Sequence, residues 1–334
     1  MAKSSNQKLK LLRLYSILFS KSDENHPMST NDLIYELERY GINAERKSIY
    51  SDIEELSFYG LDIIKIGGKK NLGYYVGERD FELAELKLLV DAVQSSKFIS
   101  ESKSKKLISK ISKLCSIYDA SALNRYVYVA NRPKTINENV LYNIDDIHYA
   151  INNHKQISFQ YLEWNTYKRL VVKKDGAIYK ISPLALIWDD ENYYLVGFDN
   201  EAGINKHFRV DKIKNINVLD DASIKPEKEI DPALYSRKMF GMYNGDFQSI
   251  NILCPIDKVG IFIDRFGKDI SIKNEVNGYC SVRIEVAVSN QFYGWFSGLG
   301  KDYTILGPPS IRNDYKKFLE SILSIYNIEE KDDE

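Results

Sequence analysis

Residues 29–76 read STNDLIYELERYGINAERKSIYSDIEELSFYGLDIIKIGGKKNLGYYV, and this stretch decides the fold of the N-terminal region. Ser29 can cap a first short helix, which Gly41 ends, and Asn43 can cap a second helix. Aliphatic residues in the second helix recur at the spacing of one buried face: Ile49, Ile53 and Leu56. The pattern predicts two amphipathic helices joined by a tight turn.

The opposite face of the second helix and the hairpin that follows it carry polar and basic side chains. The hairpin strands are predicted at 63–66 and 72–76. A helix that presents a cation, a hydroxyl and an aromatic ring on its free face suits the major groove of DNA. We therefore expect a winged helix-turn-helix over residues 1–80. Seven residues are expected to contact a double-stranded DNA operator: Arg46, Lys47, Ser48, Tyr50, Ser51, Lys69 and Lys70.

The charge balance limits this interpretation. Residues 1–80 hold twelve Lys or Arg and twelve Asp or Glu residues, so only local basic clusters can attract DNA. Short helix pairs with glycine turns are also common in proteins that bind no nucleic acid. A helix pair without a ligand is therefore the alternative.

The whole chain has the composition of a globular protein with two or three domains. It has 334 residues and a net charge of −1, and 44% of its residues are hydrophobic and 28% charged. Three widely spaced cysteines favour a reducing compartment over a disulfide framework. No signal peptide or membrane-spanning apolar run is evident, so the expected location is the cytoplasm.

Beyond residue 80 the pattern changes three times, which predicts a multidomain α+β protein. Residues 81–140 read as a helical linker. Residues 141–222 contain five or six short strands at the spacing of a small β-barrel, and residues 223–247 read as a second linker. Residues 248–328 follow the order β-α-β-β-α-β-α of a ferredoxin-like domain.

Several sequence blocks resemble the WYL-domain transcriptional regulators of bacteria, including the C-terminal WCX extension found in that family. The blocks fall in the family's order along nearly the whole chain: Lys47–Leu56, Ile157–Tyr161, Ile181–Leu186, Asn192–Gly197, His207–Ile213, Phe292–Gly300 and Ile305–Pro308. Three positions depart from the family pattern. Tyr193 replaces the Trp of the Trp-Tyr-Leu motif, and Lys212 and Ser51 stand where arginine is common.

The resemblance implies that the barrel is an Sm-like WYL domain that senses a nucleic-acid or nucleotide-like effector. The matching positions for ligand binding are Tyr161, Ser182, Tyr194, His207 and Arg209. Their chemistry agrees, because a guanidinium and an imidazole can hold phosphate and tyrosine rings can stack on bases. Three structural alternatives stay open. Tyr161 and Tyr194 can be half-buried packing residues, Arg209 can simply pair with Asp211 or another barrel carboxylate, and His207 can be a plain surface histidine.

A homodimer is expected, because two copies of a winged helix-turn-helix can engage two half-sites. The resemblance implies that the WCX domain joins the protomers. Aromatic residues there exceed what a small core needs: Phe292, Tyr293, Trp295 and Phe296.

No enzyme class is indicated by the motifs. The four histidines have no metal-ligand spacing, and neither a Gly-x-Ser-x-Gly elbow nor a phosphate-binding Gly-x-x-x-x-Gly-Lys loop is present. We therefore expect no enzymatic activity, no metal and no cofactor. The alternative function is a ligand sensor or scaffold that is built on the same domains and does not bind DNA.

Overall fold

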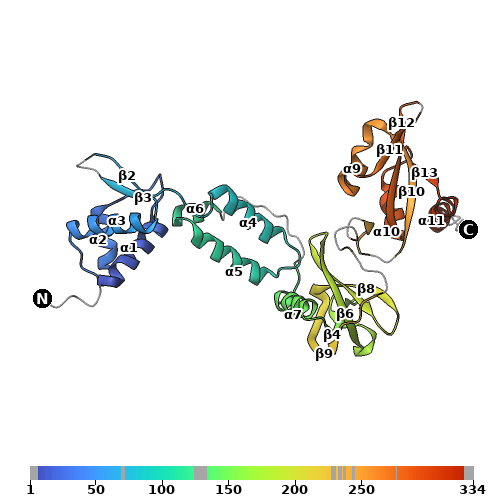
Figure 1. Ribbon diagram of the computed structural model, residues 1–334, viewed down its shortest axis with the longest axis horizontal. Coiled ribbons are helices and arrows are strands. Elements are labelled where there is room, and N and C mark those ends of the chain that lie inside the picture. Colours follow the sequence, from blue (N-terminus) through green and yellow to red (C-terminus); the bar gives the residue numbers. More distant parts are fainter. Residues whose placement is uncertain are drawn as a thin grey trace, which may run out of the picture. The chain divides into compact units, whose positions relative to one another are not determined.

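Figure 1 shows the computed structural model of the chain. It describes residues 7–68, 72–123, 134–226, 231, 235, 238–242, 245–275 and 277–326. The chain divides into two compact units, Met1–Glu138 and Asn139–Glu334. The expected wing residues Lys69 and Lys70 lie outside the described residues. In the part of the chain that is described, no helix has both the length and the apolar character needed to cross a bilayer.

The first unit begins with three helices and a small sheet, an arrangement that fits a winged helix-turn-helix. The elements are α1 (Gln7–Lys21), β1 (Met28–Ser29), α2 (Thr30–Glu38), α3 (Arg46–Tyr59), β2 (Ile63–Ile66) and β3 (Gly73–Val76). The three strands pair in the order β1-β3-β2. The core holds the aliphatic residues expected from helical spacing, including Leu33, Leu37, Ile49, Ile53 and Leu56.

The helix ends confirm one capping prediction and correct another. The Ser29 hydroxyl accepts a hydrogen bond from the Asp32 amide, and the Asp32 carboxylate accepts one from the Ser29 amide, forming a capping box on α2. Asn43 does not cap α3. The helix begins at Arg46, and Glu45 occupies the N-cap position without a side-chain hydrogen bond. At its other end α3 stops at Gly60, whose φ of 112° favours glycine.

Three further helices complete the first unit: α4 (Leu83–Ser95), α5 (Glu101–Ile111) and α6 (Ile117–Leu123), with a short 3₁₀ turn at Ser112–Leu114. Leu86 and Val90 of α4 are buried, and Leu86 packs in a cluster with Leu123 of α6. Ser100 caps α5 by accepting a hydrogen bond from the Lys103 amide. These helices agree with the predicted helical segment.

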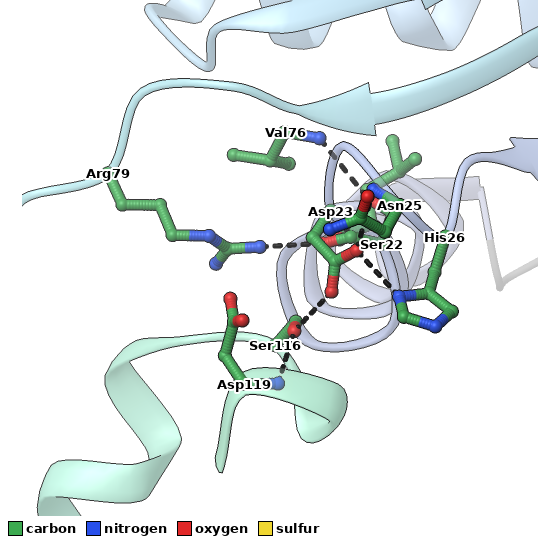
Figure 2. A network of polar contacts seen from close by, with 9 residues as sticks. Ser22, Asp23, Asn25, His26, Val76, Arg79, Ser116 and Asp119 are labelled. Carbon is green, nitrogen blue, oxygen red and sulfur yellow. Dashed lines mark hydrogen bonds and ion pairs between the residues drawn. The ribbon is translucent and has the colours of Figure 1, made fainter. Parts of the chain in front are cut away.

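A polar network joins α6 to the end of α1, and we call it the Asp23 network (Figure 2). The Asp23 carboxylate accepts hydrogen bonds from Ser116 Oγ at 2.6 Å and from His26 Nδ1 at 2.7 Å. Ser116 is fully buried and also accepts from the Asp119 amide at 3.0 Å. The His26 ring stacks on Tyr118, with ring centroids 3.6 Å apart. The start of α6 is thereby tied to the loop that precedes β1.

Arg79 fastens the segment after β3 to the same helix end. Its guanidinium donates to the carbonyl oxygens of Phe19 at 2.8 Å and Ser22 at 2.7 Å, and it lies over the Phe19 ring. The Ser22 hydroxyl accepts from the Val76 amide at 3.2 Å, which holds β3 to α1. The last carbonyl groups of α1 are thus satisfied by a cation, which the helix dipole favours.

The second unit opens with one helix and a bent sheet: α7 (Val140–Asn152), β4 (Lys155–Trp164), β5 (Leu170–Val172), β6 (Ile178–Asp189), β7 (Asn192–Asp199), β8 (Ile204–Arg209) and β9 (Ile213–Ala222). The strand order is β5-β4-β6-β7-β8, and β9 pairs with β4 on its other side. We call this part the barrel. Helix α7 packs against β4, β6 and β9 (Figure 1). The side-chain amide of its Asn143 donates a hydrogen bond to the Ile213 carbonyl at 2.9 Å, and this bond anchors the helix to the start of β9.

The C-terminal part is a four-stranded antiparallel sheet with three helices, and we call it the C-terminal sheet domain. Its elements are β10 (Asp246–Pro255), α9 (Gly260–Phe266), β11 (Ser271–Asn274), β12 (Tyr279–Val288), α10 (Asn290–Gly298), β13 (Thr304–Gly307) and α11 (Pro309–Tyr326). The sheet order is β11-β12-β10-β13. The element order β-α-β-β-α-β is the ferredoxin-like order that the sequence pattern indicates.

The cysteines are buried and carry no disulfide. Cys254 and Cys280 face each other across β10 and β12, with their sulfur atoms 3.4 Å apart. Burial raises the pKa of Cys254 to about 12 and also raises the pKa of Cys115. Cys115, Cys254 and Cys280 are all free in the structure.

The aromatic residues of α10 lie in the core, contrary to our expectation. Phe292, Tyr293 and Phe296 are at most 6% exposed, and Trp295 packs against the same core. They therefore cannot serve as the apolar surface that our dimer prediction invoked. The most exposed apolar side chains among the described residues of this domain lie instead on the last two turns of α11, including Leu323 and Tyr326, which are 58% and 79% exposed.

Candidate functional site

Two surfaces carry the residues that the sequence singled out, and the first is the free face of α3. Arg46, Lys47, Tyr50 and Ser51 are all exposed there. The Arg46 guanidinium donates to the Asn31 side chain of α2 at 2.8 Å, which links the two helices at this surface. Burial of the aliphatic face of α3 leaves these four side chains accessible to a ligand.

Ser48 has a different environment from the other four. Lys10 of α1 is only 3% exposed, and its amine donates to the Ser48 hydroxyl and pairs with Asp52 at 2.7 Å. A buried ammonium group needs such acceptors, because its desolvation is otherwise costly. The structure thus places Ser48 in an internal contact between α1 and α3. The periodicity of α3 alone could not reveal this contact, because Lys10 lies 38 residues away.

The second surface is a cavity of about 560 Å³ at one end of the barrel. Aromatic and basic side chains dominate its lining: Tyr161, Lys173, Lys174, Tyr179, Tyr194, Lys206, His207, Phe208, Arg209 and Lys212, with Gly241 and Met242. Four of the five predicted ligand residues are therefore brought together. They come from β4, β7 and β8, three strands of the same sheet.

Ser182 is the predicted residue that does not join the others. It is fully buried, and its hydroxyl accepts a hydrogen bond from the Ile224 amide at 2.9 Å. It therefore satisfies the backbone where the chain leaves β9. A register shift between Pro183 and Ala185 interrupts β6 just beyond Ser182, so strand alternation is a poor guide to orientation here.

Tyr161 has mainly a packing role in this cavity. Its hydroxyl accepts a hydrogen bond from the Arg209 amide at 3.1 Å, which connects β4 to the end of β8. Its ring contacts Phe208 edge-on, with centroids 5.2 Å apart. Burial raises the pKa of Tyr161 to about 12. The structural alternative for Tyr161 therefore matches its contacts, whereas Tyr194 is half-buried and lines the cavity.

Arg209 is paired and also lines the cavity. Its guanidinium donates to both carboxylate oxygens of Asp211, at 3.0 and 2.9 Å. Burial acts to lower the pKa of Arg209, but the hydrogen bonds and charge of Asp211 outweigh burial and raise it. The side chain keeps 34% of its surface exposed. The pair fixes the guanidinium in position and leaves part of it accessible.

Four lysines of the cavity were not predicted, and they change its electrostatics. Lys206 pairs with Asp199, and Lys173 Nζ lies 3.6 Å from Glu163. Lys212 is different, because burial lowers its pKa and the positive charge of Arg209 lowers it further. The remaining lysine, at position 174, lies over the Tyr179 ring. The adjacent lysines at 173 and 174 were the sequence feature that could have indicated this basic lining. They lie in a turn, however, and a turn has no periodicity from which to infer where its side chains point.

His207 is hydrogen-bonded to Tyr235, a residue that lies outside the barrel strands. Its Nε2 lies 3.0 Å from the Tyr235 hydroxyl, and the two ring centroids are 5.6 Å apart. Burial raises the pKa of Tyr235. Within the described residues, His, Cys, Asp and Glu side chains form no group of three that could hold a metal ion.

Comparisons with known proteins match two parts of the chain. The family model for the WYL domain matches residues 142–218, and that for the WCX domain matches residues 259–323. No curated protein sequence matches the chain.

Two solved structures resemble the chain at low sequence identity. One is proteasome accessory factor B/C (PafBC) of Arthrobacter aurescens, at 16% identity and a TM-score of 0.28, covering 94% of this chain and 47% of that one. The other is described as a CRISPR Cas-related protein, at 15% identity and a TM-score of 0.38, covering 98% of this chain and 88% of that one. The chain thus spans about half the length of the PafBC chain.

Proposed function

We propose that this chain, which contains a WYL domain and a WCX domain, is a DNA-binding transcriptional regulator. Its barrel cavity binds a nucleic-acid or nucleotide-like ligand, and ligand binding alters operator affinity. The observation that carries the proposal is the lining of the cavity. Four lysines and one arginine surround a hollow that also presents the tyrosine rings of Tyr179 and Tyr194.

The cations of the cavity favour a phosphate-bearing ligand. Asp199 and Asp211 hold Lys206 and Arg209 in place, whereas burial, and after it the positive charge of Arg209, lower the pKa of Lys212. A phosphate group beside Lys212 and Arg209 would offset both burial and mutual repulsion of these cations. Arginine binds phosphate through charge-assisted hydrogen bonds, and the Arg209 side chain keeps 34% of its surface exposed beside its pair with Asp211.

The aromatic side chains favour a base or another flat ring on the same ligand. Tyr194 is half-buried and lines the cavity. Stacking of a base on such a ring contributes about 1–3 kcal/mol and is largely independent of base identity. The combination of fixed cations and rings is typical of sites for single-stranded nucleic acid.

The DNA-binding part of the proposal rests on α3. Lys47, Tyr50 and Ser51 point away from the core on one exposed face, next to the Arg46 side chain. A helix of 14 residues with its aliphatic face buried can enter a major groove. Glu54 and Glu55 are also exposed on α3, so we expect the N-terminal half of this helix to make the contacts with bases.

Electrophoretic mobility shift on DNA from upstream of the chain's own gene tests both parts. The parent protein should shift this DNA, and a short oligothymidylate should change the shift. Lys212→Ala should abolish the effect of the oligonucleotide and leave the shift itself intact. Lys180→Ala is the matched control, because Lys180 pairs with Asp221 away from the cavity. Oligonucleotide binding without any DNA shift would support the ligand sensor or scaffold instead.

A homodimer is part of the same proposal. The exposed apolar side chains at the end of α11 support it, since a stripe of this kind on a helix needs a partner. Leu323→Glu should convert a dimer into a monomer in light scattering, with Lys316→Glu on the same helix as the control. A monomeric parent protein at micromolar concentration would contradict the proposal.

A further inference from the structure

The short segment 239–242, which precedes β10, has side chains buried in two different cores. Met239 and Met242 are at most 4% exposed and share a cluster with Ile187 and Val196 of the barrel. Phe240, between them, belongs to the core of the C-terminal sheet domain. Neighbouring side chains of one segment are therefore anchored in two different parts of the second unit. Movement of the segment would disturb both cores, because buried side chains are closely packed.

Arg265 of α9 holds the segment from the side of the C-terminal sheet domain. Its guanidinium lies 3.8 Å from the centroid of the Phe240 ring, and it donates to the Met239 carbonyl at 3.3 Å. Burial raises the pKa of Asp189 at the end of β6, and the positive charge of Arg265 opposes this rise. One cation thus interacts with the segment, with its own domain and with the barrel.

The same segment faces the cavity. Gly241 and Met242 line it directly. Tyr235, a few residues earlier, bonds His207 in the cavity and packs edge-on against Phe247 of β10, with ring centroids 5.5 Å apart. The cavity therefore has one wall made of barrel strands and a second made of residues that lead into the C-terminal sheet domain.

We infer that Gly241 and Met242 complete the ligand site as its second wall, that Tyr235 positions His207 within the site, and that Phe240 and Arg265 transmit occupation of the cavity to the C-terminal sheet domain. This inference rests on the proposed function, because it takes the cavity to be the ligand site. A ligand that contacts Met242 binds only when residues 239–242 are packed in both cores. Ligand binding and this packing must then favour each other by the same factor.

Tyr235 acts in this scheme as a positioning residue for His207. A hydrogen bond to one ring nitrogen fixes the orientation and tautomer of an imidazole, which determines what the other nitrogen can offer a ligand. Tyr235→Phe removes only the hydroxyl. It should alter the ¹⁵N NMR signals of the His207 ring and weaken ligand binding, whereas a purely structural role would leave the ring signals unchanged.

The decisive variant is Arg265→Met, because Arg265 does not line the cavity. The probe is a short fluorescein-labelled oligothymidylate, followed by fluorescence anisotropy. We expect Arg265→Met to weaken binding about five- to tenfold, within the usual range of coupling between sites. Arg312→Met removes an exposed arginine from α11 of the same domain and should bind like the parent. If Arg265→Met unfolds the domain, Arg265→Lys replaces it, since lysine keeps the charge and loses the planar contact with Phe240.

Amide hydrogen exchange at residues 239–242 separates this inference from the proposed function. The probe should slow exchange there in the parent and less so in Arg265→Met. Normal probe binding by both proteins, with unchanged exchange, would overturn the inference and leave the proposed function standing. If the parent fails to bind the probe, the proposed function fails for this ligand class. Equal exchange in the two proteins without probe would then overturn the link through Arg265 as well.

Discussion

Replacing Asp23 with alanine should release α6 from the end of α1. The carboxylate accepts from the buried Ser116 hydroxyl at 2.6 Å, and a hydrogen bond to a charged group contributes about 1.5–3 kcal/mol. The bond to His26 adds less, since that side chain is 43% exposed and an exposed ion pair contributes about 0–1 kcal/mol. We therefore expect Asp23→Ala to destabilise the attachment of α6 by about 2–3 kcal/mol.

Hydrogen exchange is the appropriate assay, because a chain with several domains does not unfold in two states. A loss of about 2–3 kcal/mol raises the population of the locally open state roughly 30- to 150-fold, and the amides of α6 should exchange faster by the same factor. Glu24→Ala is the matched control: it also removes one carboxylate, but the Glu24 side chain is exposed.

Identical exchange of α6 in Asp23→Ala and Glu24→Ala would refute this reasoning. It would mean that apolar contacts such as that between Leu86 and Leu123 hold α6 without help from the network. Faster exchange throughout the chain, and not only in the first unit, would also contradict a local role for Asp23.

Three further outcomes follow from named contacts. Desolvation acts to raise the pKa of Asp23, but its hydrogen bonds outweigh desolvation and lower the pKa below 3.8; the protection of the α6 amides, taken relative to their intrinsic exchange rate at each pH, should therefore fall as pH falls below that value, and Asp23→Ala should lack this dependence. Tyr161 has a pKa of about 12 when folded, so the stability of the barrel should fall as pH rises from about 10 to 12. Tyr161→Phe should lose this pH dependence. It should also destabilise the barrel by about 1–3 kcal/mol, because the Arg209 amide would lose its hydrogen-bond acceptor. Ser29→Ala should destabilise α2 by about 1 kcal/mol, measured as faster hydrogen exchange of the α2 amides, whereas the same change at the exposed Ser51 should leave that exchange nearly unchanged.

Local patterns predicted the elements well, because periodicity and capping act within a few residues. The Ser29 cap and the buried face of α3 are of this kind, and so is the order of strands and helices in the C-terminal sheet domain. Asn43 was misplaced because several polar residues precede α3, and only the backbone decides which one becomes the N-cap.

Long-range contacts were the part that sequence patterns could not supply. Ser116 is 93 residues from Asp23, and Tyr235 is 28 residues from His207. Nothing in the local pattern of these residues indicates their partners. Ser182 shows the complementary problem: its residue type suits a ligand site, but its hydroxyl is used by the Ile224 amide of the backbone.

The buried cysteines make the chain a convenient background for spectroscopic labels. Maleimide reagents need an accessible thiolate, and Cys115 and Cys254 are buried with raised pKa values, while Cys280 is 1% exposed. A cysteine introduced at an exposed site such as Glu38 or Lys316 should react at neutral pH long before the native thiols do. Paired spin labels at such sites would then report distances between the two units in solution, with and without DNA, while the native cysteines stay in place.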